Sequence, residues 1–238
     1  MKKVNFLFVV ALFATALFTS CGKKCDKTDP TSDCYEQPCD PTDPKGDCYD
    51  PTNPLIYDVG VAINGIKWAT RNVDMPSTFA AKPESAGMFY QWNRKVGWSS
   101  SNPIVNSNGG NVWNDSNPNG TVWTKANDPC PQGWRVPTIE ELQTLLATDK
   151  VTSKWITQND VNGYKFTDKT IGNTLFLPAV GFRGNSDGTL DGVGLHGFYW
   201  SSTHTYEYAS YNLSFISDAV STSNDHCNYG SSVRCVAE

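Results

Sequence analysis

Hydrophobic and polar residues alternate over several short stretches once the first quarter of the chain has passed, which indicates a domain built mainly of short strands. The clearest case surrounds the Asn-Gly pair at 64–65. This dipeptide is a strong hairpin signal because a type I′ turn needs a positive φ at both central residues. In that register Ile63 faces Ile66 and Val61 faces Trp68. All four side chains then lie on one face of the hairpin, which we expect to be buried.

Further strands are predicted where apolar or aromatic residues alternate or gather between turn residues. Residues 93–127 are rich in Asn, Ser, Gly and Trp but show little periodicity, so they predict a long loop region. Trp155, Tyr164 and Phe166 are expected to lie on a small excursion from the main fold. The predicted strands are residues 86–92, 175–183, 197–202, 211–215 and 231–236.

One helix is predicted with more detail than any other element. Thr138 is a good N-cap, and Glu141 stands where it would complete a capping box. The following apolar residues have the i, i+3, i+6, i+7 spacing of a stripe that faces the core. We therefore predict an α+β fold with small twisted antiparallel sheets, long loops and one clear helix over about residues 138–148. The stripe consists of Ile139, Leu142, Leu145 and Leu146.

The N-terminus has the pattern of an export signal. Lys2 and Lys3 precede an apolar run from Phe6 to Phe18, which is too short to span a bilayer and fits a signal peptide. Small residues then lead to Cys21, which resembles the lipobox of bacterial lipoproteins. The resemblance implies that residues 1–20 are removed and that Cys21 is acylated, for example with palmitate, and anchors the chain to a membrane. An ordinary secretory signal with a chance cysteine is the alternative.

Residues 21–54 have few apolar residues and are rich in Asp, Pro and Thr, so they cannot bury a core and predict an extended or disordered stalk. A cysteine pair with the same internal spacing occurs twice, fourteen residues apart. We expect two local disulfides, Cys25–Cys34 and Cys39–Cys48. The folded domain is then expected over residues 55–238.

Calcium binding by the stalk is a sharper alternative. Asp40, Asp43 and Asp47 have the oxygen chemistry that calcium needs. No stretch matches the EF-hand loop with its distal Glu, so a solvated acidic stalk is the favoured interpretation.

Charge and cysteine content narrow the class of protein. The formal net charge is −5, and loss of Lys2 and Lys3 with the signal peptide makes it −7. An acidic surface argues against nucleic acid as a partner. Eight cysteines in an exported chain suggest disulfides, and seven remain if Cys21 carries lipid. We predict a Cys130–Cys235 bond, which leaves Cys227 without an assigned partner.

Six motifs of the domain together resemble the Fibrobacter succinogenes major paralogous domain, and they occur in the family's order over roughly residues 55–238. The resemblance implies a relative of the C-type lectin-like fold, alongside the formylglycine-generating oxidases. It also implies an exported outer-membrane lipoprotein of Bacteroidetes, exposed at the cell surface, in a family whose members mostly have no known ligand. The motifs are residues 64–72, 87–92, 129–138, 177–183, 199–202 and 232–236.

A surface module of this kind is expected to bind glycan or protein. Sugar sites stack rings on Trp or Tyr and bond hydroxyls with Asn, Asp and backbone groups, and residues 93–127 and 181–197 offer that mixture. The competing interpretation is that the tryptophans belong to the core and the polar residues form turns. The Trp-Asn-Asp triplet at 113–115 does not indicate a lectin calcium site, because it precedes the helix. The candidates are Trp98, Trp113, Asn114, Asp115, Arg183, Asp187 and Asp191.

Catalysis is not predicted. Cys227 and Cys235 do not have the spacing of the reactive cysteines of the oxidase relatives. The three histidines follow no metal-binding pattern, so no cofactor or metal site is expected in the domain. Two alternatives to a binding module stay open: a structural subunit of a surface appendage, and an oxidase-like enzyme.

Overall fold

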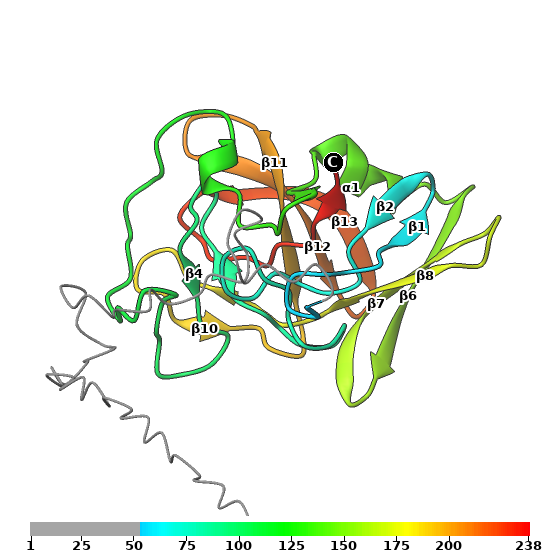
Figure 1. The fold of residues 1–238 in the computed structure, drawn as a ribbon, viewed down its shortest axis with the longest axis horizontal. Helices are drawn as coiled ribbons and strands as arrows, with labels where there is room; N and C mark the ends of the chain where they lie inside the picture. Colours follow the sequence, from blue (N-terminus) through cyan, green and yellow to red (C-terminus); the bar gives the residue numbers. More distant parts are fainter. Residues whose placement is uncertain (1–52) are drawn as a thin grey trace, which may run out of the picture. The chain divides into compact units, whose positions relative to one another are not determined.

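The structure is a computed structural model that describes residues 53–238 (Figure 1). The predicted signal peptide, the Cys21 lipidation site, the stalk disulfides and the stalk aspartates lie outside the described residues. Within residues 53–238 the strands form five small sheets, with every strand pair antiparallel, and one α-helix accompanies them. The predicted α+β class with small antiparallel sheets is therefore confirmed.

The bounds of the elements show how short most strands are. Eight of the fourteen strands in the described part of the chain have only two or three residues, so loops connect most of the domain. The elements are β1 (Val61–Ile63), β2 (Ile66–Trp68), β3 (Phe89–Tyr90), β4 (Gly97–Trp98), the 3₁₀ helix η1 (Lys125–Asn127), β5 (Trp134–Arg135), α1 (Ile139–Thr144), β6 (Val151–Gln158), β7 (Val161–Asp168), β8 (Thr174–Pro178), β9 (Phe182–Arg183), β10 (Leu190–Asp191), β11 (Gly197–His204), β12 (Ala209–Ile216), β13 (Ala219–His226) and β14 (Val236–Ala237).

The first sheet joins the two ends of the domain. Its order is β1-β2-β14-β5, and β14 lies beside β2 in Figure 1. The predicted hairpin register is confirmed, with Val61 opposite Trp68 and Ile63 opposite Ile66. The turn has φ values of 47° at Asn64 and 82° at Gly65, as a type I′ turn requires.

The second sheet, β6-β7-β8, corrects one expectation. Trp155, Tyr164 and Phe166 lie on two paired eight-residue strands and not on a small excursion. The connecting turn uses Asn159 and Asp160 at φ values of 46° and 65°. This hairpin turn contains no glycine, and the exposed residues of β6 are polar. The sequence signal for a β6–β7 hairpin is therefore weak.

The third sheet has the order β11-β12-β13. The predicted strands at 197–202 and 211–215 are present and longer than expected, but β13 was not predicted. Its residues are mostly small and polar and mostly exposed, so it has no hydrophobic alternation. Pairing with β12 along its whole length defines it as a strand.

Helix α1 begins as predicted and ends earlier. The capping box is confirmed: the Thr138 hydroxyl accepts from Glu141 N, and the Glu141 carboxylate accepts from Thr138 N at 2.8 Å. The helix stops at Thr144, because Leu145 N and Leu146 N bond to carbonyls only three residues back and tighten the last turn. No helix in the described part of the chain is long and apolar enough to cross a membrane.

Two other predicted strands shrink to short pieces. In 86–92 only β3 is a strand, and it pairs with β4. In 231–236 only the start of β14 is a strand, and Ser231 and Ser232 make isolated bridges to Tyr90 and Tyr199. The terminal segment thus contacts several sheets in turn rather than extending one.

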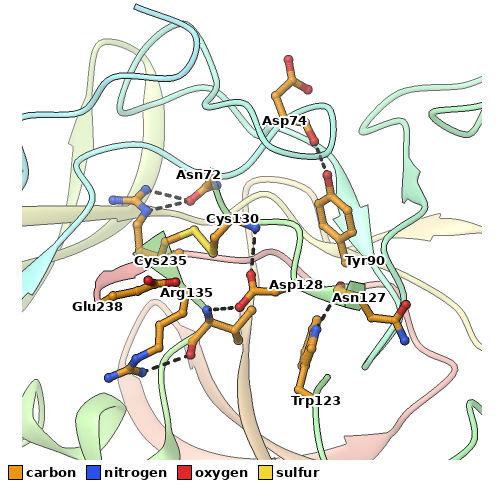
Figure 2. The surroundings of a disulfide bond; sticks show 12 residues. Asn72, Asp74, Tyr90, Trp123, Asn127, Asp128, Cys130, Arg135, Cys235 and Glu238 are labelled. Atoms are coloured by element: carbon orange, nitrogen blue, oxygen red, sulfur yellow. Dashed lines mark hydrogen bonds between the residues drawn. A yellow bond between two sulfur atoms is a disulfide. The ribbon is translucent and has the colours of Figure 1, made fainter. Parts of the chain in front are cut away.

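A disulfide ties the last segment of the chain to the stretch that precedes the helix (Figure 2). Cys130 and Cys235 are bonded, with their Cα atoms 6.1 Å apart. Asp128 shapes the adjacent loop, because its carboxylate accepts from Cys130 N at 2.9 Å and from Val136 N at 3.2 Å. Burial raises the pKa of Asp128 despite these bonds. The bond lies in a core cluster whose tryptophans are Trp92, Trp123, Trp134 and Trp200.

Candidate functional site: an asparagine-rich groove

An open depression of about 840 Å³ lies on the surface of the domain. We call it the asparagine-rich groove. It lies between the β3–β4 turn and the loop of residues 106–119, within the region predicted as a long loop. It is lined by Gln91, Asn93, Arg94, Lys95, Val96, Trp98, Asn106, Asn108, Val112, Asn114, Ser116, Asn117, Pro118, Asn119 and Asn127.

Asn93 organises one end of the groove. It occupies the left-handed region at φ 52°, which asparagine tolerates better than most residues. Its side-chain oxygen accepts from Thr124 N at 2.9 Å, and its amide nitrogen donates to Asn119 O at 3.1 Å. One buried side chain therefore holds the β3–β4 turn against both flanks of the loop that leads to η1.

Gln91 and Arg94 hold the middle of the loop. The Gln91 side chain is 1% exposed and donates to Asn114 O at 2.6 Å and to Asn228 O at 2.9 Å. Arg94 donates to Ser116 O at 2.9 Å, and burial lowers the pKa of its guanidinium. Hydrogen bonds from side chains near the β3–β4 turn, rather than backbone pairing between strands, thus position this wall of the groove.

Several amides of the groove are free to meet a ligand. Among the described residues, the side chains of Asn108, Asn117 and Asn119 make no hydrogen bond, and the Asn117 oxygen is buried without a partner. An unpaired buried amide costs about 1–3 kcal/mol, which a bound hydroxyl or water would recover. Arg94 and Lys95 are the charged lining residues, so the groove is locally cationic in an acidic protein.

The two predicted tryptophans have mainly packing roles. Trp98 lines the groove but is 3% exposed, and its ring packs on Trp113 with centroids 4.8 Å apart. Trp113 donates from its indole nitrogen to Asn185 O at 3.0 Å. Its ring fills the space beside Gly188, where an added Cβ would come within 2.6 Å. The buried Trp98 ring therefore has no open face on which a sugar could stack, and the partly exposed Trp113 ring contacts Trp98 and the backbone at Gly188.

Arg183 corrects the expectation of a binding residue on the glycine-rich segment. Its side chain is fully buried and donates to Ser99 O at 2.8 Å, Gly188 O at 2.6 Å and Ser101 O at 2.7 Å. Burial lowers its pKa. Backbone carbonyls from two loops surround the guanidinium, so Arg183 joins those loops and leaves no surface for a ligand.

The remaining candidates divide between the groove and ordinary turns. Asn114 lines the groove, and its side-chain oxygen accepts from Ser116 N at 3.1 Å. Asp115 does not line it. Asp187 is exposed and accepts from Thr189 N at 2.9 Å, a bond that lowers the Asp187 pKa. Asp191 accepts from Gly192 N at 2.6 Å. The structure therefore brings only Trp98 and Asn114 together in one hollow.

The sequence pattern does not single out Gln91, Asn93 and Arg94 as residues of the groove. A weak signal was present, because Gln91 interrupts an otherwise aromatic and apolar stretch. A polar residue inside such a stretch is buried with hydrogen-bond partners, and those partners come from a loop whose path is not visible in the sequence.

The sulfur and metal chemistry of the domain is limited. Over residues 53–238, no group of three His, Cys, Asp or Glu side chains could hold a metal ion. Cys227 is the free cysteine of this region, buried, with its sulfur 3.2 Å from the Ser210 hydroxyl. Burial raises the pKa of the Cys227 thiol, which lowers the fraction of reactive thiolate.

Comparisons with known proteins agree with the motifs of the sequence. Searches of curated proteins and of solved structures found no match. The model of the Fibrobacter succinogenes major domain family matches residues 61–237, which cover almost all of the described domain. The chain therefore belongs to the Fibrobacter succinogenes major domain family.

Proposed function

We propose that this protein is a lipid-anchored, non-catalytic binding module of the cell envelope that recognises a glycan in the asparagine-rich groove. The observation that carries the proposal is the set of unbonded amides at Asn108, Asn117 and Asn119, beside the cations Arg94 and Lys95. Amides pair with sugar hydroxyls, and the two cations favour a glycan that carries carboxylate or sulfate groups.

Anchoring and fold are parts of the same proposal. The lipobox-like residues before Cys21 support acylation, export to the outer membrane and display at the cell surface on a stalk. A divergent C-type lectin-like fold is supported by the pairing of β2 with β14, which closes both ends of the domain in one sheet, and by the long loops around the groove.

The proposal of a non-catalytic module is supported by the state of the cysteines. An oxidase-like mechanism with Cys227 and Cys235 would need both as thiols, and Cys235 is bonded to Cys130. Cys227 lies buried in the same core cluster.

The test is a glycan array probed with the full-length protein. We expect binding to acidic glycans, weakened about thirtyfold by Lys95→Gln combined with Asn117→Ala, since each of the two lost hydrogen bonds is worth about 1 kcal/mol. Asn224→Ala is the matched control, because Asn224 is exposed on β13 and outside the groove. An array without bound glycan, or equal binding by the groove variant, would contradict the proposal.

An assembly role is the second candidate, favoured by the free edge of β13. No other strand among residues 53–238 pairs with the outer side of this eight-residue strand. It also contains no Lys or Pro, residues that commonly protect edges, whereas the edge strand β6 contains Lys154. Another chain could therefore add a strand there.

The substitution Ser223→Lys tests the assembly role, because it places a lysine on the edge strand β13. Ser223 lies on the same face of the sheet as Ser221. We expect the variant to lose self-association or capture of subunits in cross-linking of the full-length protein, while its glycan binding is unchanged. Wild-type protein that stays uncross-linked at high concentration would rule out assembly through β13.

A further inference from the structure

A second, smaller pocket of about 110 Å³ lies apart from the groove and shares no lining residue with it. Three aromatic residues, one carboxylate and one serine form its walls. We call it the aromatic pocket. Its lining residues are Phe182, Phe198, Asp225, Tyr229 and Ser231.

Backbone pairing brings these residues together from four segments. Phe198 on β11 and Asp225 on β13 lie on the same face of the third sheet, because their partners on β12 are Ser214 and Ser210, two positions of equal parity. Ser232 N donates to Phe198 O, which brings the segment 229–232 beside β11. An antiparallel Arg183–Gly230 bridge places Phe182 opposite Ser231, and the Phe182 ring contacts the ring of Tyr229 diagonally.

The rings form a concave aromatic surface. Phe182 meets Phe198 edge to face, with centroids 5.2 Å apart and an interplanar angle of 75°. It meets Tyr229 at 5.9 Å and 61°. All three rings are partly exposed rather than buried in the core. In an edge-to-face pair one ring turns its positively polarised edge to the other, and a ring face that stays open beside the hollow is the negatively polarised surface that attracts a cation.

Asp225 supplies the charge. One of its oxygens accepts from Asn212 Nδ2 at 2.7 Å, which orients the carboxylate. Within residues 53–238 no Lys or Arg forms an ion pair with it. His196 stacks on Phe182 at 6.4 Å but does not line the pocket. The pocket therefore combines ring faces with a carboxylate that no cationic side chain neutralises.

The small size and apolar walls select among cations. A primary ammonium keeps three N–H donors that need acceptors, and this pocket has one carboxylate and few other polar groups. A quaternary ammonium has no N–H donor and presents only methyl groups to the rings. Such a group suits an aromatic cage with a single counter-charge.

We propose that the aromatic pocket binds a small quaternary ammonium group. The site is separate from the asparagine-rich groove and does not depend on glycan recognition there. The ring faces of Phe182, Phe198 and Tyr229 surround the methyl groups, and Asp225 balances the charge. Choline and phosphocholine carry this group, and both serve as probes.

The experiment is titration calorimetry of the full-length protein with choline. The control ligand is 3,3-dimethylbutan-1-ol, in which carbon replaces the nitrogen, so that shape is kept and charge is lost. We expect choline to bind at least about tenfold more tightly than the alcohol, a ratio that corresponds to a cation–π and charge gain of about 1.4 kcal/mol. Phosphocholine, as the second arm, shows whether the group is recognised free or on a headgroup.

Two variants make the result specific to the pocket. Asp225→Asn and Phe198→Leu should each weaken choline binding about tenfold or more. Asp218→Asn removes the same charge from the exposed β12–β13 turn, outside the pocket, and should leave binding unchanged. Equal binding of choline and the alcohol, equal loss in the Asp218 variant, or no heat with either ammonium probe would overturn the proposal. Far-ultraviolet circular dichroism checks that each variant is folded.

Discussion

Two arginines show how individual residues of this domain are used. Arg183 and Arg234 are both fully buried and neither forms an ion pair with a described carboxylate. Arg234 donates to the Asn72 side-chain oxygen at 2.7 Å and to Phe176 O at 3.2 Å, and burial lowers its pKa to about 10. Each guanidinium satisfies oxygen atoms from segments that are distant in the chain. Long polar side chains here take the place of secondary structure in holding loops together.

Because of Tyr199, we expect the free energy of unfolding to depend on pH in the alkaline range. It is buried and donates to Pro178 O at 2.8 Å, and burial raises its pKa from 10.0 to about 12. Below pH 10 the phenol is protonated in both states, so its contribution to stability is fully present. Between pH 10 and 12 the unfolded state ionises first, and the free energy of unfolding falls by up to about 1.4 kcal/mol per pH unit.

Tyr199→Phe tests this assignment. We expect it to cost about 1 kcal/mol at pH 8, through the lost hydrogen bond, and to reduce the loss of stability between pH 10 and 12. Urea unfolding at pH 8, 10 and 11 measures both effects. The buried Tyr90, whose pKa burial also raises, still contributes in the variant. Parallel stability curves for the two proteins would show that Tyr199 is not the titrating group.

The elements differ in how they are stabilised. Helix α1 has six residues, too few to be stable alone, and depends on its capping box and on the burial of Ile139 and Leu142. The three-stranded sheets depend on close contact between strands. Gly197 on β11 lies directly opposite Phe215 on β12, and the Phe215 ring occupies the space that a side chain would need.

Gly197→Ala tests that contact. An added Cβ would lie 2.1 Å from the Phe215 ring, so we expect a destabilisation of about 1–3 kcal/mol from overpacking. Gly184→Ala is the control, because the nearest atom to its added Cβ is 3.6 Å away. Urea unfolding compares the two variants with wild type. An equal effect of both substitutions would mean that close packing of β11 on β12 is not the cause.

At the scale of the whole domain, the Cys130–Cys235 bond joins residues 105 positions apart. It connects the stretch before α1 to the last strand, so the chain between them forms one covalently closed loop. In the chain-entropy model a loop of this length stabilises by about 4–5 kcal/mol. A contribution of this size is comparable with the entire free energy of unfolding of many domains.

Removing the bond by Cys130→Ala with Cys235→Ala should lower the free energy of unfolding by about 4–5 kcal/mol. Cys227→Ala is the comparison, since it removes a buried thiol of the same core cluster without opening a loop. Urea unfolding under non-reducing conditions measures the difference. Peptide mapping of native protein that found Cys130 and Cys235 unlinked would contradict the topology itself.

Local signals in the sequence predicted the hairpin at Asn64-Gly65 and the capping box at Thr138, because each depends on a few adjacent residues. They failed for β13 and for the length of α1. Strand β13 is stabilised by its neighbour β12 and has little apolar pattern of its own. The helix ends where the chain must turn toward β6, which helical periodicity alone does not show.

The sequence by itself determined the family, the antiparallel α+β class, the hairpin register and the start of the helix. Only the tertiary structure decided which polar residues face solvent. In the folded domain Arg183 is buried, and Trp98 and Trp113 pack against each other. The groove and the aromatic pocket are each lined by residues that are distant in the sequence. The physical reason is that short strands joined by long loops are held by side-chain hydrogen bonds between remote residues, which leave no periodic trace in the chain.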